Sequence, residues 1–231
     1  VSCAFNQIVN NVAKTYYRWE RPVPMVIRLP YGGGAGAGPF HSQCDEAWFT
    51  HVPGLAVVAP STARDALGML KAAIRDPNPV IFLENEILYG KSFDVPKLDD
   101  FVLPIGKARI HKKGSDVTLV SFGIGMTYLV KAEPELRALG IDAEIIDLRT
   151  LLPLDLDTIV ESVKKTGRCV VIHEATTTSG FGAELVTLVQ ENCFYHLEAP
   201  VARVAGWDTP YPHAQEWDYF PGPARVGRAL I

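Results

Sequence analysis

The chain of 231 residues has 48% apolar side chains and a formal net charge of −4, from 22 Lys and Arg against 26 Asp and Glu. This length and composition can bury one large core or two modest ones. Basic residues nowhere form a run of four, and apolar runs such as Val57–Val58 are far too short to cross a bilayer. We therefore expect a soluble protein that binds neither nucleic acid nor membrane.

Four cysteines lie far apart in the sequence, with no CxxC pair, at Cys3, Cys44, Cys169 and Cys193. This pattern suits a reducing compartment and argues against structural zinc. The chain starts at Val1 with neither Met nor a basic n-region, and a helical pattern begins within a few residues. We interpret this start as truncated or processed, and not as a targeting signal.

The first half of the chain alternates helices with short apolar strands. Apolar residues recur at helical spacing over residues 5–16, which predicts an amphipathic helix. Strands are expected at Met25–Leu29, Leu55–Ala59 and Val80–Glu84. Ser61 or Thr62 can cap a helix that ends near Arg75, with Asp65 in its first turn.

Composition changes over residues 85–104, which are rich in Pro, Asp and Lys, and we place a linker at residues 91–104. Strands are then expected at Asp116–Phe122, Ala143–Asp147, Cys169–Glu174 and Val201–Ala205. Helices are expected near Thr127–Leu139, Leu156–Thr166 and Gly182–Asn192. This alternation predicts a parallel sheet with right-handed crossovers. The fold class is therefore α/β, with two parallel-sheet domains at residues 1–90 and 105–231, the first missing its beginning.

A glycine-rich run, Gly32–Gly38, follows the first expected strand. Phosphate-binding loops need a helix N-terminus next, whereas Pro39 and Phe40 follow here and no GK[ST] occurs. A shaped loop beside a cofactor or a subunit is the better interpretation. His41 comes directly afterwards, where open α/β sheets place ligand-facing groups, and an imidazole suits proton transfer near neutral pH. A structural loop histidine is equally compatible with this pattern.

Other polar residues admit plainer interpretations. Asp76 and Asn78 lie between a helix and a strand and could hold a hard cation, although an ordinary Asp-Pro-Asn-Pro turn is favoured. His173 and Glu174 end a buried strand, and a hydrogen-bonded strand-end histidine is the plainer interpretation. His213 could serve an interface. No GxSxG or HExxH motif occurs.

Six segments carry a family likeness, in collinear order over nearly the whole chain. They are FNQIVN at 5–10, HSQ at 41–43, AIRDPNP at 73–79, VIFLENE at 80–86, IDLRT at 146–150 and HEA at 173–175. Together they resemble the β subunits of thiamine-diphosphate-dependent 2-oxo acid dehydrogenase complexes. The resemblance implies a transketolase-like pyrimidine-binding domain, incomplete here, followed by a transketolase C-terminal-like domain.

The same resemblance implies an α2β2 heterotetramer with thiamine diphosphate between the chains. The α subunit would hold Mg²⁺ and the diphosphate, and the Gly-Asp-Gly and downstream Asn pattern of that site is absent from this sequence. The family's glutamate that protonates the aminopyrimidine lies upstream of the opening helix, so cofactor-binding residues of this chain stay unassigned. A dihydrolipoyl acyltransferase core is the other expected partner, in bacterial cytoplasm or the mitochondrial matrix.

By position, His41 matches the family's active-site histidine, which would orient the substrate or lipoyl arm and stabilise charge as carbon dioxide leaves. The family also holds a potassium ion near this site. Its ligands correspond to the backbone carbonyls of Met25, Ala73 and Ile74, and to Asp76 and Asn78. The ion would brace the pyrimidine-binding domain without taking part in the chemistry.

The expected reaction is decarboxylation of a 2-oxo acid followed by acyl transfer to a lipoyl group. From His41 to Arg149 the chain looks most like pyruvate dehydrogenase. From Asp155 onward, including Trp207–His213, it looks most like the branched-chain 2-oxo acid (2-oxoisovalerate) dehydrogenase. Because the residues nearest the cofactor lie in the first part, pyruvate is favoured. A catalytically silent assembly module is the alternative from another functional class.

Overall fold

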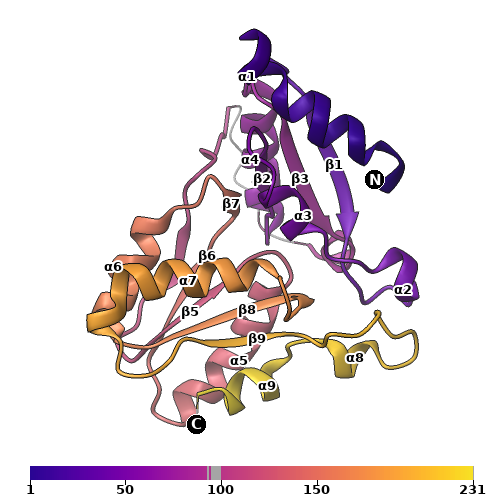
Figure 1. Cartoon of the computed structure of the whole chain (residues 1–231). Helices are drawn as coiled ribbons and strands as arrows, with labels where there is room; N and C mark the ends of the chain where they lie inside the picture. The colour runs from indigo at the N-terminus through magenta and orange to yellow at the C-terminus, as the bar shows by residue number, and fades with distance from the viewer. Residues whose placement is uncertain (93, 95–99, 231) are drawn as a thin grey trace.

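The computed structural model describes residues 1–92, 94 and 100–230. They form two mostly parallel β-sheets with helices packed on them, one from each half of the chain (Figure 1). Part of the expected linker, Phe93 and residues 95–99, lies outside the described residues. Within the described part of the chain, no helix is both long and apolar enough to cross a membrane.

The first sheet has the strand order β1-β3-β2-β7. Its strands are β1 (Val26–Tyr31), β2 (Ala56–Val58), β3 (Val80–Asn85) and β7 (Thr150–Leu152). Strands β1 and β3 are parallel and in register from Val26 opposite Val80 to Tyr31 opposite Asn85. Both strands therefore end at the same edge of the sheet. All residues of β3 except Glu84 are buried, as expected for a central parallel strand.

The opening helix is less regular than the sequence predicts. The expected single helix over residues 5–16 is interrupted: Gln7–Asn11 forms a π turn between 3₁₀ turns at Ser2–Ala4 and Val12–Lys14, and α1 covers only Thr15–Trp19. Asparagine and β-branched residues in this segment are weak helix formers, which accounts for the irregularity. The remaining helices are α2 (Gly38–His41), α3 (Glu46–Thr50) and α4 (Ala63–Arg75).

The capping prediction for α4 is confirmed. The Thr62 hydroxyl accepts a hydrogen bond from the Asp65 backbone N–H at 3.1 Å, and Asp65 lies in the first turn. After β3, a 3₁₀ turn at Glu86–Gly90 ends the first half of the chain.

The second sheet has the strand order β4-β6-β5-β8-β9. Its strands are β4 (Arg109–Lys112), β5 (Val117–Ser121), β6 (Ala143–Asp147), β8 (Cys169–Thr176) and β9 (Ala202–Gly206). The helices are α5 (Gly125–Ala138), α6 (Leu156–Thr166), α7 (Phe181–Cys193), α8 (Glu216–Tyr219) and α9 (Pro223–Arg228), with a 3₁₀ turn at Phe194–His196. The central order β6-β5-β8-β9 is parallel, as predicted.

The predicted pair of parallel-sheet domains is confirmed, and each sheet adds one antiparallel strand at its edge. Strand β4 pairs antiparallel with β6. Strand β7 leaves the second half of the chain and pairs antiparallel with β2 of the first sheet. Both strands are short, and β4 is partly exposed, so neither has the apolar run that marks a central strand.

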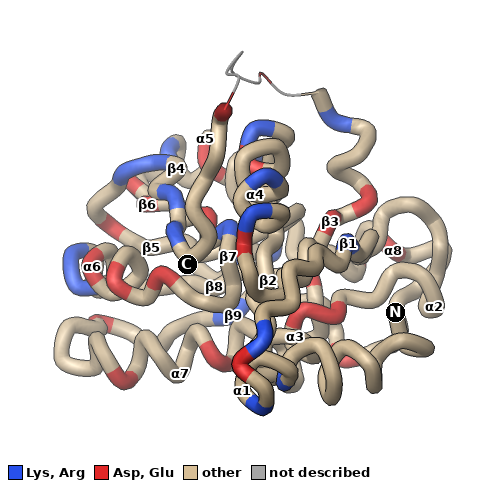
Figure 2. The backbone as a smooth tube through the Cα atoms, turned by 90° about the horizontal axis from the view of Figure 1, so that it is seen from above, with Lys and Arg blue, Asp and Glu red and all other residues tan. Residues whose placement is uncertain are grey.

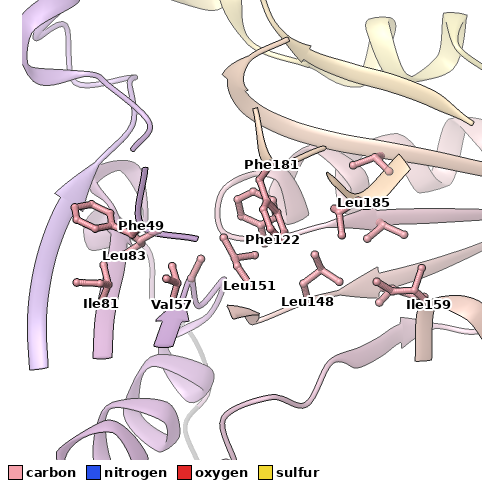
Figure 3. Packing of buried hydrophobic residues seen from close by; sticks show 14 of the residues in the cluster. Phe49, Val57, Ile81, Leu83, Phe122, Leu148, Leu151, Ile159, Phe181 and Leu185 are labelled. Atoms are coloured by element: carbon pink, nitrogen blue, oxygen red, sulfur yellow. The ribbon is translucent and has the colours of Figure 1, made fainter. Parts of the chain in front are cut away.

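The largest hydrophobic core is shared by the two halves of the chain. Phe49, Val57 and Leu83 from the first half lie in one cluster with Phe122 and Phe181 from the second (Figure 3). The labelled side chains come from strands β2, β3 and β7, from helices α3, α6 and α7, and from the residues that directly follow β5 and β6. The shared core holds the carboxyl edge of the first sheet against the second half, and the candidate site lies at that edge.

Candidate active site

The loop that follows β1 lies at the carboxyl edge of the first sheet, where open α/β sheets place their binding sites. It runs from Gly32 to Gln43 and is closed at its base by a hydrogen bond from Gly32 N to Gln43 O of 3.1 Å. The short helix α2 forms its far side, beside the segment that carries α8 (Figure 1). No Lys, Arg, Asp or Glu occurs in this loop, which is tan throughout in Figure 2.

His41 is the last residue of α2, and its side chain is exposed. The preceding side chain, Phe40, is 84% exposed, which is unusual for a ring of this size. By contrast, Ser42 is completely buried, so the chain turns inward immediately after His41. An imidazole and an aromatic ring therefore project together from a loop whose base is anchored in the protein.

Glu174, at the end of β8, is a buried acceptor for this loop. Its Oε1 accepts a hydrogen bond of 2.6 Å from Gly33 N and one of 3.2 Å from the Tyr211 hydroxyl. Its Oε2 accepts a bond of 3.0 Å from Asn85 Nδ2, at the end of β3. Burial raises the pKa of Glu174 to about 7, although these three donors act in the opposite direction.

A second buried acid, Glu46, begins α3 directly after the loop. It is 1% exposed, and neither carboxylate oxygen has a hydrogen-bond partner among the described residues. Burial raises its pKa to about 8, with the nearby carboxylate of Glu174 contributing in the same direction. Glu46 is therefore protonated and neutral at pH 7 in this arrangement.

The residues predicted to bind potassium lie at the amino end of the first sheet, not beside His41. Met25 precedes β1, and its carbonyl accepts a hydrogen bond from Val80 N, at the start of β3, at 2.9 Å. Because β1 has six residues, this end lies roughly 20 Å from the edge that bears His41. The fold therefore places the predicted potassium site and His41 at opposite ends of the first sheet, and not close together as expected.

The donor set at this end of the sheet suits a hard monovalent cation. Ala73 and Ile74 lie in the last turn of α4, where the Ala73 carbonyl accepts a hydrogen bond of 3.3 Å from Asp76 N and each carbonyl oxygen has a second lone pair for a ligand. Asp76 is the residue that ends the helix, and its Oδ1 accepts bonds from Asn78 N at 2.8 Å and Asn78 Nδ2 at 3.2 Å. A carboxylate at the negative end of a helix is unfavourable alone, and a bound cation would offset this repulsion. Among the described residues, no group of three or more His, Cys, Asp or Glu could hold a metal ion.

His173 is completely buried in β8, and neither ring nitrogen forms a hydrogen bond of normal geometry within the described residues. A backbone group of Ala175 interacts with the ring and acts to raise its pKa, so the interpretation of His173 as a hydrogen-bonded strand-end residue stays a prediction. The ring packs against Gly180 and Gly182 at the start of α7, where a β-carbon would lie within 3 Å of it. Burial lowers the pKa of His173 to about 4, so the imidazole is neutral. His213 instead lies against Gly38, at the start of α2.

Two family models match this chain. The transketolase pyrimidine-binding domain matches residues 2–91, and the transketolase C-terminal domain matches residues 106–226. The β subunit of the pyruvate dehydrogenase E1 component from Rhizobium meliloti is 61% identical over 91% of the chain and 46% of the relative. The 2-oxoisovalerate dehydrogenase β subunit from Pseudomonas aeruginosa is 52% identical over 98% of the chain and 69% of the relative.

The chain belongs to the 2-oxo acid dehydrogenase β-subunit family. Another relative, a mitochondrial pyruvate dehydrogenase E1 β subunit from Caenorhabditis elegans, is 49% identical over 92% of the chain and 62% of the relative. The chain thus spans about half to two thirds of the length of these curated relatives. A split-gene transketolase, solved as an inactive β4 tetramer, has the same fold, with a TM-score of 0.77 and 24% identity over 99% of the chain and 71% of that structure.

Within this β-subunit fold, sequence reasoning found His41 but missed the residues that surround its loop. Glu174 was singled out only as part of a strand end, and Glu46 and Tyr211 were not singled out for any role. Gly33 and Glu174 are separated by 141 residues, so no local pattern connects them. The one available signal was the glycine run itself, which implied packing against another part of the protein.

Proposed function

We propose that this chain is the β subunit of a 2-oxo acid dehydrogenase, which decarboxylates a 2-oxo acid with thiamine diphosphate and transfers the acyl group to lipoyl groups. The observation that carries the proposal is the exposed His41, which projects with Phe40 from an anchored loop at the carboxyl edge of the first sheet. Membership of the β-subunit family supports the assignment of this edge as the reaction site.

The residues present fit one wall of a thiamine diphosphate site. An aromatic ring and an imidazole, both exposed, can contact a planar heterocycle and the substrate bound beside it. The uncharged loop Gly32–Gln43 offers no cation for a diphosphate, which agrees with a site completed by an α subunit. When bound, thiamine diphosphate supplies the carbon nucleophile that attacks the 2-oxo group and accepts the electrons released with carbon dioxide.

His41 would act on the oxygen of the 2-oxo group. A protonated imidazole donates a hydrogen bond to that oxygen while negative charge develops there, and this stabilises the transition state more than the ground state. The same ring can orient the lipoyl group that receives the acyl product. Both roles need an accessible ring, and the exposed side chain of His41 supports them.

Exposed aromatic side chains support a role as one subunit of a larger assembly. Tyr17 is 92% exposed, Tyr195 94% and Trp217 73%, and large apolar side chains left in water are typical of protein interfaces. We propose an α subunit as the partner of the first half, in an α2β2 heterotetramer that holds Mg²⁺ on the α side. The acyltransferase core is the proposed partner of the assembled enzyme.

A potassium ion at the end of α4 is the proposed structural cofactor. Carbonyl oxygens of Met25, Ala73 and Ile74 and the side chains of Asp76 and Asn78 would ligate it. The carboxylate at the helix C-terminus and the oxygen-only donor set support a hard cation at this point.

Pyruvate is the favoured substrate because the relative with 61% identity carries that name. 2-Oxoisovalerate is the second candidate, supported by the 52% identity that extends over 98% of the chain. The test is steady-state decarboxylation by the full-length subunit co-expressed with its α subunit, with thiamine diphosphate and Mg²⁺. We expect kcat/KM for pyruvate to exceed that for 2-oxoisovalerate at least tenfold. Absence of turnover with either acid, in a verified α2β2 assembly, would refute the proposed function.

A further inference from the structure

The glycine loop is held from the second half of the chain at two backbone amides. Gly33 N donates to Glu174 at 2.6 Å, and Gly36 N donates to both carboxylate oxygens of Glu216, each at 3.2 Å. Glu216 is the first residue of α8, and the two acceptors follow their donor glycines by 141 and 180 residues. Each glutamate is at most 5% exposed. Hydrogen bonds from neutral donors to buried carboxylates are stronger than those between neutral groups.

At three of its glycines, Gly32, Gly33 and Gly38, the loop also packs so closely on neighbouring side chains that a β-carbon would not fit. A β-carbon at Gly33 would lie 1.9 Å from the Tyr211 hydroxyl, and one at Gly38 would lie 2.1 Å from the His213 ring. At Gly32, the obstacle is Asn85 at 2.2 Å, and this side chain is itself bonded to Glu174. Glycine is thus required for close approach, and the contacts restrict a segment that would otherwise be flexible.

Glu174 is the centre of this arrangement because its three partners come from three different segments. Gly33 belongs to the loop, Asn85 ends β3, and Tyr211 belongs to the segment between β9 and α8. All three are donors, and no Lys or Arg forms an ion pair with Glu174 within the described residues. This carboxylate therefore joins the loop to both sheets through hydrogen bonds alone.

We propose that Glu174 is a positioning residue, which fixes the glycine loop and thereby sets the location of His41 relative to the reacting carbonyl. This inference rests on the proposed function of His41. Glu174 does not reach the substrate itself, since it is buried on the inner side of the loop. Tyr211 donates a hydrogen bond to Glu174, and Glu216 accepts one from Gly36 N. Both residues therefore help to hold the loop in the same position. The second half of the chain thereby contributes to the geometry of a site that lies on the first.

The loss of this contact has a defined expected effect. Glu174→Gln keeps the shape of the side chain but directs an amide N–H₂ at either Asn85 Nδ2 or Gly33 N, so one donor faces another. The loop then loses one attachment and His41 samples more positions. A displacement of about 1 Å in a catalytic group can reduce the rate about a hundredfold. We expect kcat of the α2β2 enzyme to fall between ten- and a hundredfold, with KM changed less than threefold.

The test is a double-mutant cycle in the α2β2 enzyme with Glu174→Gln, His41→Ala and the combined variant. If Glu174 acts through His41, Glu174→Gln should change kcat of the His41→Ala enzyme less than twofold. Glu198→Gln is the matched control, because Glu198 is a surface residue paired with Arg168, and its kcat should equal that of the wild type. Equal losses from Glu174→Gln with and without His41 would overturn the inference.

Hydrogen exchange provides a readout that does not depend on turnover. Amides of residues 32–43 should exchange at least fivefold faster in Glu174→Gln than in Glu198→Gln, with exchange in β5 and β8 unchanged. If Glu174→Gln does not assemble, Tyr211→Phe removes only the hydroxyl hydrogen bond to Glu174 and enters the same cycle, with a smaller loss of kcat. If His41→Ala strongly lowers kcat, but Glu174→Gln lowers kcat by the same factor with and without His41, the positioning role fails while the proposed function stands.

Discussion

Removal of the Asp65 carboxylate should destabilise the junction between the two halves of the chain. Asp65 lies in the first turn of α4 and is completely buried. Its Oδ1 lies 2.7 Å from Arg149 Nη2, and its Oδ2 lies 3.4 Å from Arg109 Nη2. Arg109 also contacts Asp147 at 2.9 Å. The four charges form a cluster in which both arginines belong to the second half of the chain.

In Asp65→Ala, the two guanidinium groups keep only Asp147 as a counter-charge. Breaking a buried ion pair by removing one partner costs about 3 to 5 kcal/mol. Because the side chain of Arg109 is 24% exposed and can recover some hydration, we expect a loss of about 3 kcal/mol. With a urea dependence of about 3 kcal/mol per molar, this lowers the midpoint of unfolding by about 1 M.

The assay is urea unfolding of the purified chain, followed by circular dichroism at one fixed protein concentration. Asp100→Ala is the control, because Asp100 forms an ion pair with Arg75 in which both side chains are more than half exposed. Its midpoint should equal that of the wild type. Equal midpoints for Asp65→Ala and Asp100→Ala would refute the reasoning that the buried cluster joins the two halves.

Three further substitutions test the buried and cation-binding groups. Burial raises the pKa of Glu46 from 4.5 to about 8. The contribution of Glu46 to stability is therefore complete below pH 4.5 and is lost as the pH rises to 8. Glu46→Gln should raise the urea midpoint at pH 8 and leave it nearly unchanged at pH 5. Burial lowers the pKa of His173 from 6.5 to about 4. The contribution of His173 to stability is therefore complete above pH 6.5, and the free energy of unfolding falls by up to about 3 kcal/mol as the pH decreases to 4. His173→Phe should remove this loss at acid pH, and an unchanged loss would contradict the assignment of the loss to His173. Replacement of K⁺ by Na⁺ should lower the thermal midpoint of the wild type by several degrees but not that of Asp76→Ala, whereas equal shifts in both would exclude this carboxylate as a ligand.

The regular parts of the fold could be predicted because their signals are local. The strand at Ala143–Asp147 and the helix at Leu156–Thr166 have the predicted bounds, since apolar runs and helical periodicity depend on neighbouring residues. The sequence could not predict that β7 joins the first sheet, because its three residues pair with β2 from the other half of the chain. The choice of partner depends on the tertiary fold, and a run of three residues carries no information about it.

The candidate site shows the same division between local and distant information. His41 follows a strand and a glycine run, and both features are visible in the sequence. The buried pair of acids cannot be seen in the sequence, because Glu46 and Glu174 come together only when the two halves of the chain pack. The environment of His173 is hidden for a related reason, because its ring packs against glycines at the start of α7. Burial of that kind depends on packing and cannot be inferred from a strand end alone.

The measurement that tests the central claim most directly is decarboxylation by the α2β2 enzyme carrying His41→Ala, compared with His111→Ala. His111 is also exposed, but it lies on β4 of the second sheet, away from the glycine loop. We expect His41→Ala to lower kcat by at least a hundredfold, which corresponds to about 2.7 kcal/mol of transition-state stabilisation, and His111→Ala to retain wild-type turnover. Wild-type turnover in a correctly assembled His41→Ala enzyme would contradict the account.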